Sequence, residues 1–269
     1  MRRKRKHEKE EDKIFVKYFS FLIQLICWVV LMYSLFEIGR WYIHNKQNEN
    51  IMNEISNAII VEQNENTEQS DKATQNSYKI DFQSLKNVNS DTIAFIKVPG
   101  TDIEYPIVKT TNNDFYLKHS LDKTYNAAGW IFMDYRNKLD GTDKNIVVYG
   151  HNRKNGSMFS SLKNVLNKQW YNNPENLKIQ FITEQEQTVY EVFSVYQIEV
   201  ESYYLQTEFR NDKGYESFIE TIKGRSIKDF GINLNTDDEI LTLSTCANDN
   251  NYRVVLHARK VKQNIEVDN

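Results

Sequence analysis

The pattern of apolar positions changes along the chain. Residues 18–38 form one predominantly apolar run, YFSFLIQLICWVVLMYSLFEI, whereas from residue 78 onward apolar residues recur in short runs separated by turns. A run of about 20 apolar residues is long enough to cross a bilayer as a helix. Short runs rich in Val, Ile and aromatic residues are instead typical of strands. The pattern predicts one transmembrane helix followed by a β-rich domain.

The charges around the apolar run predict its orientation. Residues 1–17 contain eight Lys or Arg and four Asp or Glu, and basic residues favour the cytoplasmic side of a span. A cleaved signal peptide is the competing interpretation, but the run ends in FEIGRWYIHN, which has no small-residue cleavage site. We therefore expect a basic cytoplasmic tail at 1–17, a retained anchor at 18–38 and an extracellular body held at the cell membrane.

Polar residues dominate the stretch at 39–77. Within it, Ile51, Ile55 and Ile59 recur with helical spacing, and residues 61–77 are rich in Asn, Gln, Glu and Ser. Apolar residues with helical spacing predict a helix, and a polar tract without them predicts an unfolded linker. We expect a juxtamembrane helix and a polar stalk here, with the folded domain at 78–269.

The folded domain contains eight short apolar runs that predict strands. Helices are expected at 81–89, from Ser157 onward and after Asp212, which is placed to cap a helix. About eight strands with few helices predict a mainly β fold with flanking helices, in the form of a closed or nearly closed β-barrel. The strands are expected at residues 92–98, 103–108, 129–134, 145–150, 177–183, 188–200, 239–246 and 252–260.

Charge and motif content exclude several function classes. The net charge is −3, and because the N-terminal tail is basic, the remaining chain is more acidic than this total. A nucleic-acid partner is therefore not expected. The sequence has no glycine-rich phosphate loop and no Cys/His spacing typical of a structural metal site. We expect no metal and no cofactor.

One cysteine is placed where a nucleophile would be expected. Cys27 lies inside the apolar run, which leaves Cys246 as the single thiol of the predicted extracellular domain. Cysteines outside the cell normally pair, so an unpaired one is a candidate nucleophile. His151 follows the apolar run NIVVYG, and Arg253 comes seven residues after Cys246. The strand ends of a barrel can bring these three residues together.

The three residue types suit acyl transfer. A cysteine nucleophile needs a nearby imidazole or positive charge, because a free thiol is mostly protonated at neutral pH. A histidine can also protonate a leaving amine, and a guanidinium can stabilise the oxyanion. Each residue alone also fits a structural or surface role, so the inference depends on the combination.

The combination also resembles a known family. TLSTC followed by Arg253 resembles the TLxTC…R signature of sortases, and YGHN resembles their catalytic histidine segment. The stretches IAFIKVPGTDIEYPIV, NNDFYLKHS and GWIFMDYRN are similar to class B sortases in particular, and the likeness covers about residues 80–260. A helix between the 188–200 strand and the nucleophile strand is the feature that separates class B from classes A and C.

The resemblance implies an eight-stranded sortase barrel at 78–269 and a cell-wall sorting reaction in a Gram-positive bacterium. Cys246 would cleave a C-terminal sorting signal, NPxTN-like or (S/P)PxTG-like, after its Thr and form a thioester. A peptidoglycan precursor or cross-bridge amine would then resolve the thioester. By the same resemblance, His151 is the general acid/base, and Arg253 stabilises the oxyanion or positions the substrate.

Four further positions carry over from class B sortases as substrate-binding residues. Asn113 and Leu117 would lie beside the groove, Tyr204 on the segment after the 188–200 strand, and Ser244 next to the nucleophile. The stretch ANDNN after Cys246 is shorter than in some class B members, which leaves open whether Asn248 or Asp249 contacts substrate. No acidic cluster matches the calcium site of class A enzymes, so the resemblance also implies no metal.

Two alternatives remain. The chain could be another extracellular thiol enzyme, such as a papain-like or cell-wall endopeptidase, although those place the cysteine at a helix N-terminus and upstream of the histidine. It could instead be a noncatalytic, membrane-tethered binding barrel, which would have no need for an isolated thiol near a histidine and an arginine. Hydrolysis rather than transpeptidation also stays open within the sortase interpretation.

Overall fold

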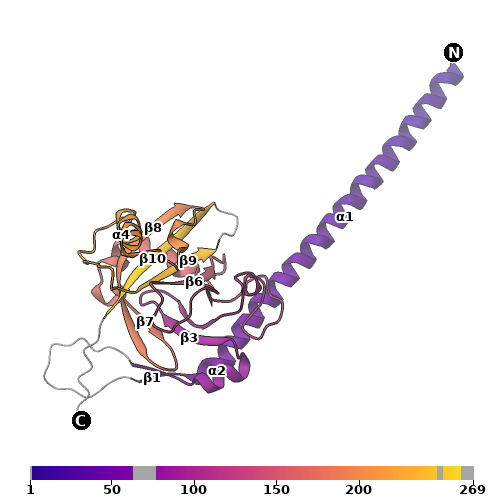
Figure 1. Cartoon of the computed structure of the whole chain (residues 1–269). Coiled ribbons are helices and arrows are strands. Elements are labelled where there is room, and N and C mark those ends of the chain that lie inside the picture. Colours follow the sequence, from indigo (N-terminus) through magenta and orange to yellow (C-terminus); the bar gives the residue numbers. More distant parts are fainter. Residues whose placement is uncertain (1, 63–76, 247–250, 262–269) are drawn as a thin grey trace, which may run out of the picture. The chain divides into compact units, whose positions relative to one another are not determined.

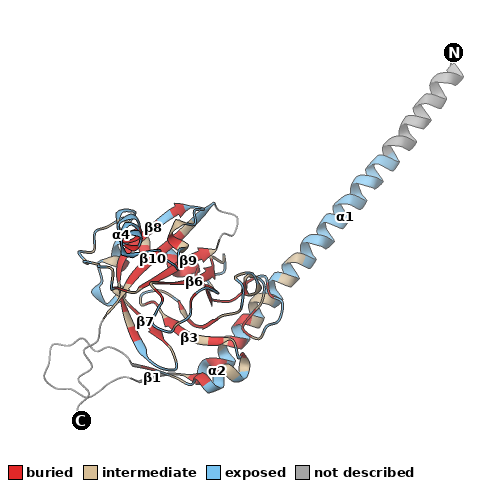
Figure 2. Ribbon diagram, in the orientation of Figure 1, coloured by how far each residue is buried: buried red, intermediate tan, exposed pale blue. Residues whose placement is uncertain are grey.

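The computed structural model describes residues 2–62, 77–246 and 251–261. Two compact units comprise residues 1–47 and 48–269. The first unit is the greater part of helix α1 (Arg2–Ile55). Within the described residues, Lys17–Ala58 is the one stretch long and apolar enough to cross a membrane. Its apolar side chains between Tyr18 and Ile43 are exposed (Figure 2), so this helix could serve as a membrane anchor.

The end of α1 corrects the expectation for residues 39–77. Ile51 and Ile55 are buried in the core of the second unit, so the folded unit begins near Asn48 rather than at Tyr78. Ile59 is not helical, because η1 (Ser56–Ala58) ends the helix and Ile59 begins β1 (Ile59–Glu62). Strand β1 pairs antiparallel with β2 (Ser77–Ile80). Residues 63–76 of the expected stalk lie outside the described residues.

Eight strands close into a barrel in the order β10-β8-β7-β3-β4-β5-β6-β9 (Figure 1), which confirms the predicted fold. Two of the neighbouring pairs, β4/β5 and β6/β9, are parallel. The run at 129–134 is strand only at its centre, in β5. The strands are β3 (Thr92–Lys97), β4 (Glu104–Val108), β5 (Phe132–Met133), β6 (Asn145–His151), β7 (Lys178–Ile182), β8 (Gln187–Glu199), β9 (Ile240–Cys246) and β10 (Tyr252–Lys260).

Short helices connect the strands. Two differ from expectation: the helix expected from Ser157 is a 3₁₀ helix, η3, and Asn211 rather than Asp212 caps α4. The Asn211 backbone is extended, and its Oδ1 accepts a hydrogen bond from the Gly214 N–H at 2.9 Å, as an N-cap requires. The helices that follow β2 in the chain are α2 (Phe82–Val88), η2 (Phe115–Leu117), η3 (Ser160–Leu166), α3 (Lys168–Tyr171), η4 (Pro174–Leu177), η5 (Tyr203–Leu205) and α4 (Asp212–Gly224).

The core has two parts. The larger fills the barrel and includes Ile51 and Ile55 of α1. The smaller lies between α4 and the outside of the barrel, where Phe218 and Ile222 of α4 share a cluster with Tyr196 of β8. In the chain, α4 lies between β8 and β9, as the resemblance to class B sortases implies.

Candidate active site

The parallel pairing of β6 and β9 places the two predicted reactive side chains opposite each other. In that ladder His151 is the register partner of Cys246, and both are the last residues of their strands. Every residue of β6 is buried, as is usual for a strand in a parallel pair. Because both faces are packed, a slip by one residue would exchange the side chains that pack on the two faces, and this fixes the register.

Arg253 comes to the same place from the other side of β9. Strand β10 pairs antiparallel with β9, with Val255 opposite Ser244. Continuing this register by two residues would set Arg253 opposite Cys246, and both residues line the same pocket. The Val254 N–H donates to Thr245 Oγ1 at 2.9 Å, which ties the start of β10 to the end of β9.

These strand ends open into a pocket of about 810 Å³. The seven site residues expected from the sequence all line it, although they come from five separate chain segments. Its lining comprises Asn113, Asp114, Leu117, Lys118, Tyr125, Ala127, Phe132, Tyr149, His151, Val200, Glu201, Ser202, Tyr204, Leu205, Ser244, Thr245, Cys246 and Arg253.

His151 is held as a neutral imidazole with one free lone pair. It is 8% exposed, and its Nε2 lies 2.9 Å from the Leu117 carbonyl oxygen. Because a carbonyl can only accept, Nε2 carries the proton and Nδ1 is the acceptor. Nδ1 is buried and has no hydrogen-bond partner among the described residues. Burial lowers the pKa of His151, and the positive charges of Arg153 and Arg253 lower it further.

Gly129 makes the close approach of His151 possible. Its φ is +60°, in the left-handed region. A Cβ at this position would lie 2.5 Å from the Tyr116 carbonyl oxygen and 2.9 Å from Cδ2 of His151. Only glycine therefore fits where the loop carrying Leu117 passes the imidazole.

Cys246 is held in its protonated form. Burial raises the pKa of the thiol to about 12, and the charge of Arg253 opposes this rise. The resting pair is thus a thiol and a neutral imidazole, and a nucleophilic thiolate requires transfer of the thiol proton. Nδ1 of His151, in the same pocket, is a buried base without a hydrogen-bond partner among the described residues.

Arg253 keeps a hydrogen-bond donor available. Its NH1 is buried and has no hydrogen-bond partner among the residues that the structure describes. A buried guanidinium nitrogen without a partner is costly. The donor therefore suits a ligand atom that carries or develops negative charge in the pocket.

Comparison with known proteins decides the family. A family model described as Sortase domain matches residues 96–261. Sortase B of Listeria monocytogenes is 32% identical over 253 residues, covering 90% of this chain and 98% of its own. The chain belongs to the sortase family, class B.

Solved structures agree with this assignment. The crystal structure of Clostridium perfringens sortase B is 38% identical, with a TM-score of 0.63 over 67% of this chain and 100% of that one. The Staphylococcus aureus sortase B–substrate complex is 32% identical, with a TM-score of 0.63 over 67% of this chain and 84% of that one. Sortases are cysteine transpeptidases, so this chain is an enzyme of that kind.

The substrate-binding residues expected from the resemblance line the sortase pocket in different ways. Leu117 lines the pocket, and its carbonyl oxygen contacts Nε2 of His151. Tyr204 and Ser244 lie 3.1 Å apart, hydroxyl to hydroxyl, so each fixes the other. Asn248 and Asp249 lie outside the described residues. The expectation that no metal or cofactor takes part stays a prediction.

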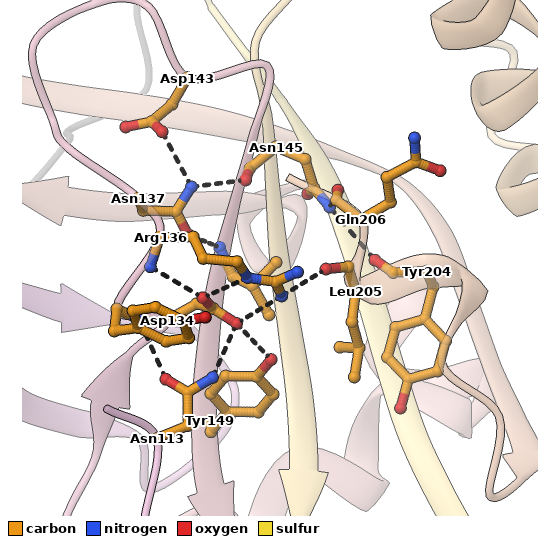
Figure 3. Close-up of polar contacts among 12 residues, drawn as sticks. Asn113, Asp134, Arg136, Asn137, Asp143, Asn145, Tyr149, Tyr204, Leu205 and Gln206 are labelled. Carbon is orange, nitrogen blue, oxygen red and sulfur yellow. Dashed lines mark hydrogen bonds and ion pairs between the residues drawn. The ribbon is translucent and has the colours of Figure 1, made fainter. Parts of the chain in front are cut away.

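Sequence reasoning missed a group of residues behind the pocket wall. Buried Asp134 forms an ion pair with the half-exposed Arg136 at 2.8 Å, and the Tyr149 hydroxyl donates to Asp134 Oδ2, also at 2.8 Å (Figure 3). The signal that could have found them is the stretch FMDYRN, in which polar residues follow directly after an apolar strand. A charge at a strand exit is usually solvated, and pattern alone does not distinguish a buried one.

Proposed function

We propose that this sortase cleaves a C-terminal sorting signal after its Thr through a Cys246 thioester and transfers the protein to a peptidoglycan amine. The observation that carries the proposal is the register of β6, β9 and β10, which brings His151 and Arg253 to the two sides of Cys246. The substrate would be a surface protein whose signal is NPxTN-like or (S/P)PxTG-like.

The first half of the reaction forms the thioester. The Cys246 thiol gives its proton to Nδ1 of His151, and the sulfur attacks the carbonyl carbon of the substrate Thr. The carbonyl oxygen becomes an oxyanion, towards which Arg253 can donate from its free NH1. The imidazolium then protonates the leaving nitrogen as the peptide bond breaks. The products are the acylated Cys246, the released C-terminal peptide and a neutral imidazole.

The second half reverses these roles. An acceptor amine attacks the thioester carbonyl, and Nδ1 of His151 takes the proton that the amine loses. The tetrahedral intermediate collapses, the Cys246 thiolate leaves, and the imidazolium returns its proton to the sulfur. A sortase B has been solved in complex with triglycine, and the Staphylococcus aureus enzyme with substrate, which supports a peptide donor and an amine acceptor here.

The reaction would take place at the outer face of the membrane. We propose that residues 1–17 are cytoplasmic, 18–38 span the bilayer and the barrel unit is extracellular, because basic residues precede the apolar stretch. The anchor would keep the enzyme beside its membrane-bound substrates. Protease treatment of protoplasts should digest the barrel unit from outside. Recovery of a shortened, soluble form from the medium would instead indicate signal cleavage.

A quenched fluorescent peptide library tests the reaction. Peptides carrying NPxTN and (S/P)PxTG motifs are incubated with the full-length enzyme in detergent micelles, with and without an amine acceptor, and the products are identified by mass spectrometry. The proposal expects cleavage after Thr and an amide-linked product when the amine is present. Hydrolysis alone in both conditions would favour the thiol endopeptidase, and binding without cleavage would favour the noncatalytic barrel.

A further inference from the structure

Three residues that line the pocket are connected to the buried carboxylate of Asp134 (Figure 3). Asn113 and Tyr149 contact it directly, and Leu205 is connected to it through Arg136. Asp134 directly follows β5 and is 0% exposed. Its Oδ2 accepts hydrogen bonds from Asn113 Nδ2 at 3.0 Å, from the Tyr149 hydroxyl at 2.8 Å and from Arg136 NH2 at 2.8 Å. Its Oδ1 accepts from the Arg136 backbone N–H at 3.0 Å and from Arg136 Nε at 2.8 Å.

Arg136 connects this arrangement to η5. Its NH2 group also donates to the Leu205 carbonyl oxygen of η5 at 2.8 Å. Asn113, Tyr149 and Leu205 all line the catalytic pocket, yet they come from the segment before η2, from β6 and from η5. Both oxygens of the Asp134 carboxylate already accept hydrogen bonds from the groups named above. The carboxylate is therefore not free to bind a ligand or to take a proton from one.

Asp134 also fixes the direction of the Asn113 amide. The Nδ2 group donates to Asp134, while Oδ1 accepts from the Tyr135 N–H at 3.0 Å. This pairing assigns the two ends of the amide without ambiguity and leaves one N–H and one lone pair unused. The remaining N–H and lone pair therefore have fixed directions at the pocket wall.

The electrostatics keep Asp134 ionised. Burial alone would raise its pKa, but the hydrogen bonds and charge of Arg136, together with the Tyr149 hydroxyl, lower it overall. The pKa of Tyr149 is raised by burial and by the negative charge of Asp134, so its hydroxyl stays a donor. The hydrogen-bonding pattern of the group is thus constant at neutral pH.

We propose that Asp134 is a positioning residue that sets the spacing of the pocket walls, and with it the affinity of the pocket for the sorting-signal peptide. The inference rests on the proposed function, since it concerns the same pocket. It does not place Asp134 in the chemistry, because Asp134 is absent from the pocket lining.

The test compares Asp134→Asn with a matched control, Asp143→Asn. Asp143 is also a buried carboxylate after β5, 9% exposed, and it accepts hydrogen bonds from the backbone N–H groups of Lys138 and Leu139. It does not line the catalytic pocket. Both substitutions keep the side-chain shape and remove a charge. Arg136 is half-exposed, so water can solvate its charge when Asp134 is neutral.

Two measurements separate positioning from catalysis and from stability. The first is the Kd of fluorescent NPxTN and SPxTG peptides for each variant in the Cys246→Ala background. The second is the split between KM and kcat in the active enzyme. Displacing positioning groups slightly can cost up to about 100-fold. We expect Asp134→Asn to raise Kd and KM by roughly tenfold or more, with little change in kcat, and Asp143→Asn to leave Kd and KM unchanged.

Milder variants keep the proposal testable if Asp134→Asn fails to fold. Arg136→Lys retains the charge but loses the planar fork that joins Asp134 to Leu205, and Tyr149→Phe removes a single donor. Each should weaken peptide binding less than Asp134→Asn. Wild-type Kd in all folded variants would overturn the proposal and make Asp134 a scaffold residue. An enzyme that binds peptide in an Asp134-dependent manner but never cleaves it would instead refute the proposed function and leave this inference standing.

Discussion

His151 and His257 lie in two regions of the same barrel, and their rings differ in their hydrogen-bond partners. His151 lies on β6 and His257 on β10, the two strands that pair with β9. Both are buried, and in both cases burial lowers the pKa. The ring of His257, however, has partners on both sides: Nδ1 lies 2.8 Å from Thr242 Oγ1 and Nε2 lies 2.8 Å from the Tyr196 hydroxyl.

The hydrogen bonds around His257 leave it no lone pair to offer. Thr242 Oγ1 donates to Asn145 Oδ1 at 2.6 Å, so it accepts from Nδ1–H of His257. Nε2 of His257 then accepts from Tyr196. His151 differs because its Nδ1 has no partner among the described residues, and because His151 lines the same pocket as Cys246. Burial lowers the pKa of both rings, and we propose that the unused lone pair of Nδ1 suits His151 to the role of proton acceptor.

Replacing each histidine by glutamine should give the largest difference in kcat between the two regions. His151→Gln removes the proton acceptor, and loss of a general acid/base typically costs about 10²- to 10⁴-fold. His257→Gln keeps hydrogen-bonding groups at a residue that does not itself line the pocket, so its kcat should stay close to wild type. Steady-state kinetics on a cleavable peptide give both values. Equal losses in the two variants would remove the distinction drawn between the histidines.

Arg253 offers a second, smaller test of the catalytic region. If its free NH1 stabilises the oxyanion, the loss should appear in kcat, by about 100- to 1,000-fold for one such donor. Arg253→Lys keeps the charge but loses the planar fork, so it should restore little activity. Melting temperatures of the Lys and Ala variants provide the control. Substantial activity in Arg253→Lys, together with an unstable Arg253→Ala, would make the residue structural.

The smallest expected effect concerns the pH dependence of stability in the His257 region. Burial lowers the pKa of His257 to about 3, whereas an unfolded chain binds this proton near pH 6.5. The unfolded state binds more protons between these values, so acidification favours unfolding, by about 1.4 kcal/mol for each pH unit. His257→Gln should therefore flatten the decline of Tm between pH 6.5 and 4.

Tyr196→Phe is the control for this effect. It removes the hydrogen bond to Nε2 but leaves the titrating ring in place, so its Tm should still fall as steeply as that of the wild type. If His257→Gln and the wild type lose stability with the same slope, His257 does not account for the acid sensitivity.

The sequence predicts the barrel well because each strand has a strong local pattern. The run at 252–260 matches β10, and the run at 145–150 falls one residue short of β6. The β5 run is shorter than expected because only Phe132 and Met133 find register partners. The spacing of Ile59 from Ile55 predicts a helix, and only pairing with Ile80 makes Ile59 a strand residue.

The sequence suggests the candidate site residues but not the groups that support them. Cys246, His151 and Arg253 stand out because their chemistry is unusual at strand ends, and motif resemblance supplies the four positions that are expected to bind substrate. Gly129 and Asp134 could not be recognised in this way. Their importance arises from contacts across long stretches of chain, such as that of Asp134 with Asn113, which no local pattern encodes.

The proposed mechanism is tested most directly by identifying the residue to which the substrate's acyl group becomes bound. The full-length enzyme in detergent micelles is mixed with a cleavable sorting-signal peptide, quenched in acid and mapped by mass spectrometry. We expect the N-terminal peptide fragment, ending in its Thr, to be bound to Cys246 in the wild type and in Cys27→Ala, and to be absent in Cys246→Ala. An adduct on any other residue, or undiminished cleavage in Cys246→Ala, would contradict the proposed mechanism.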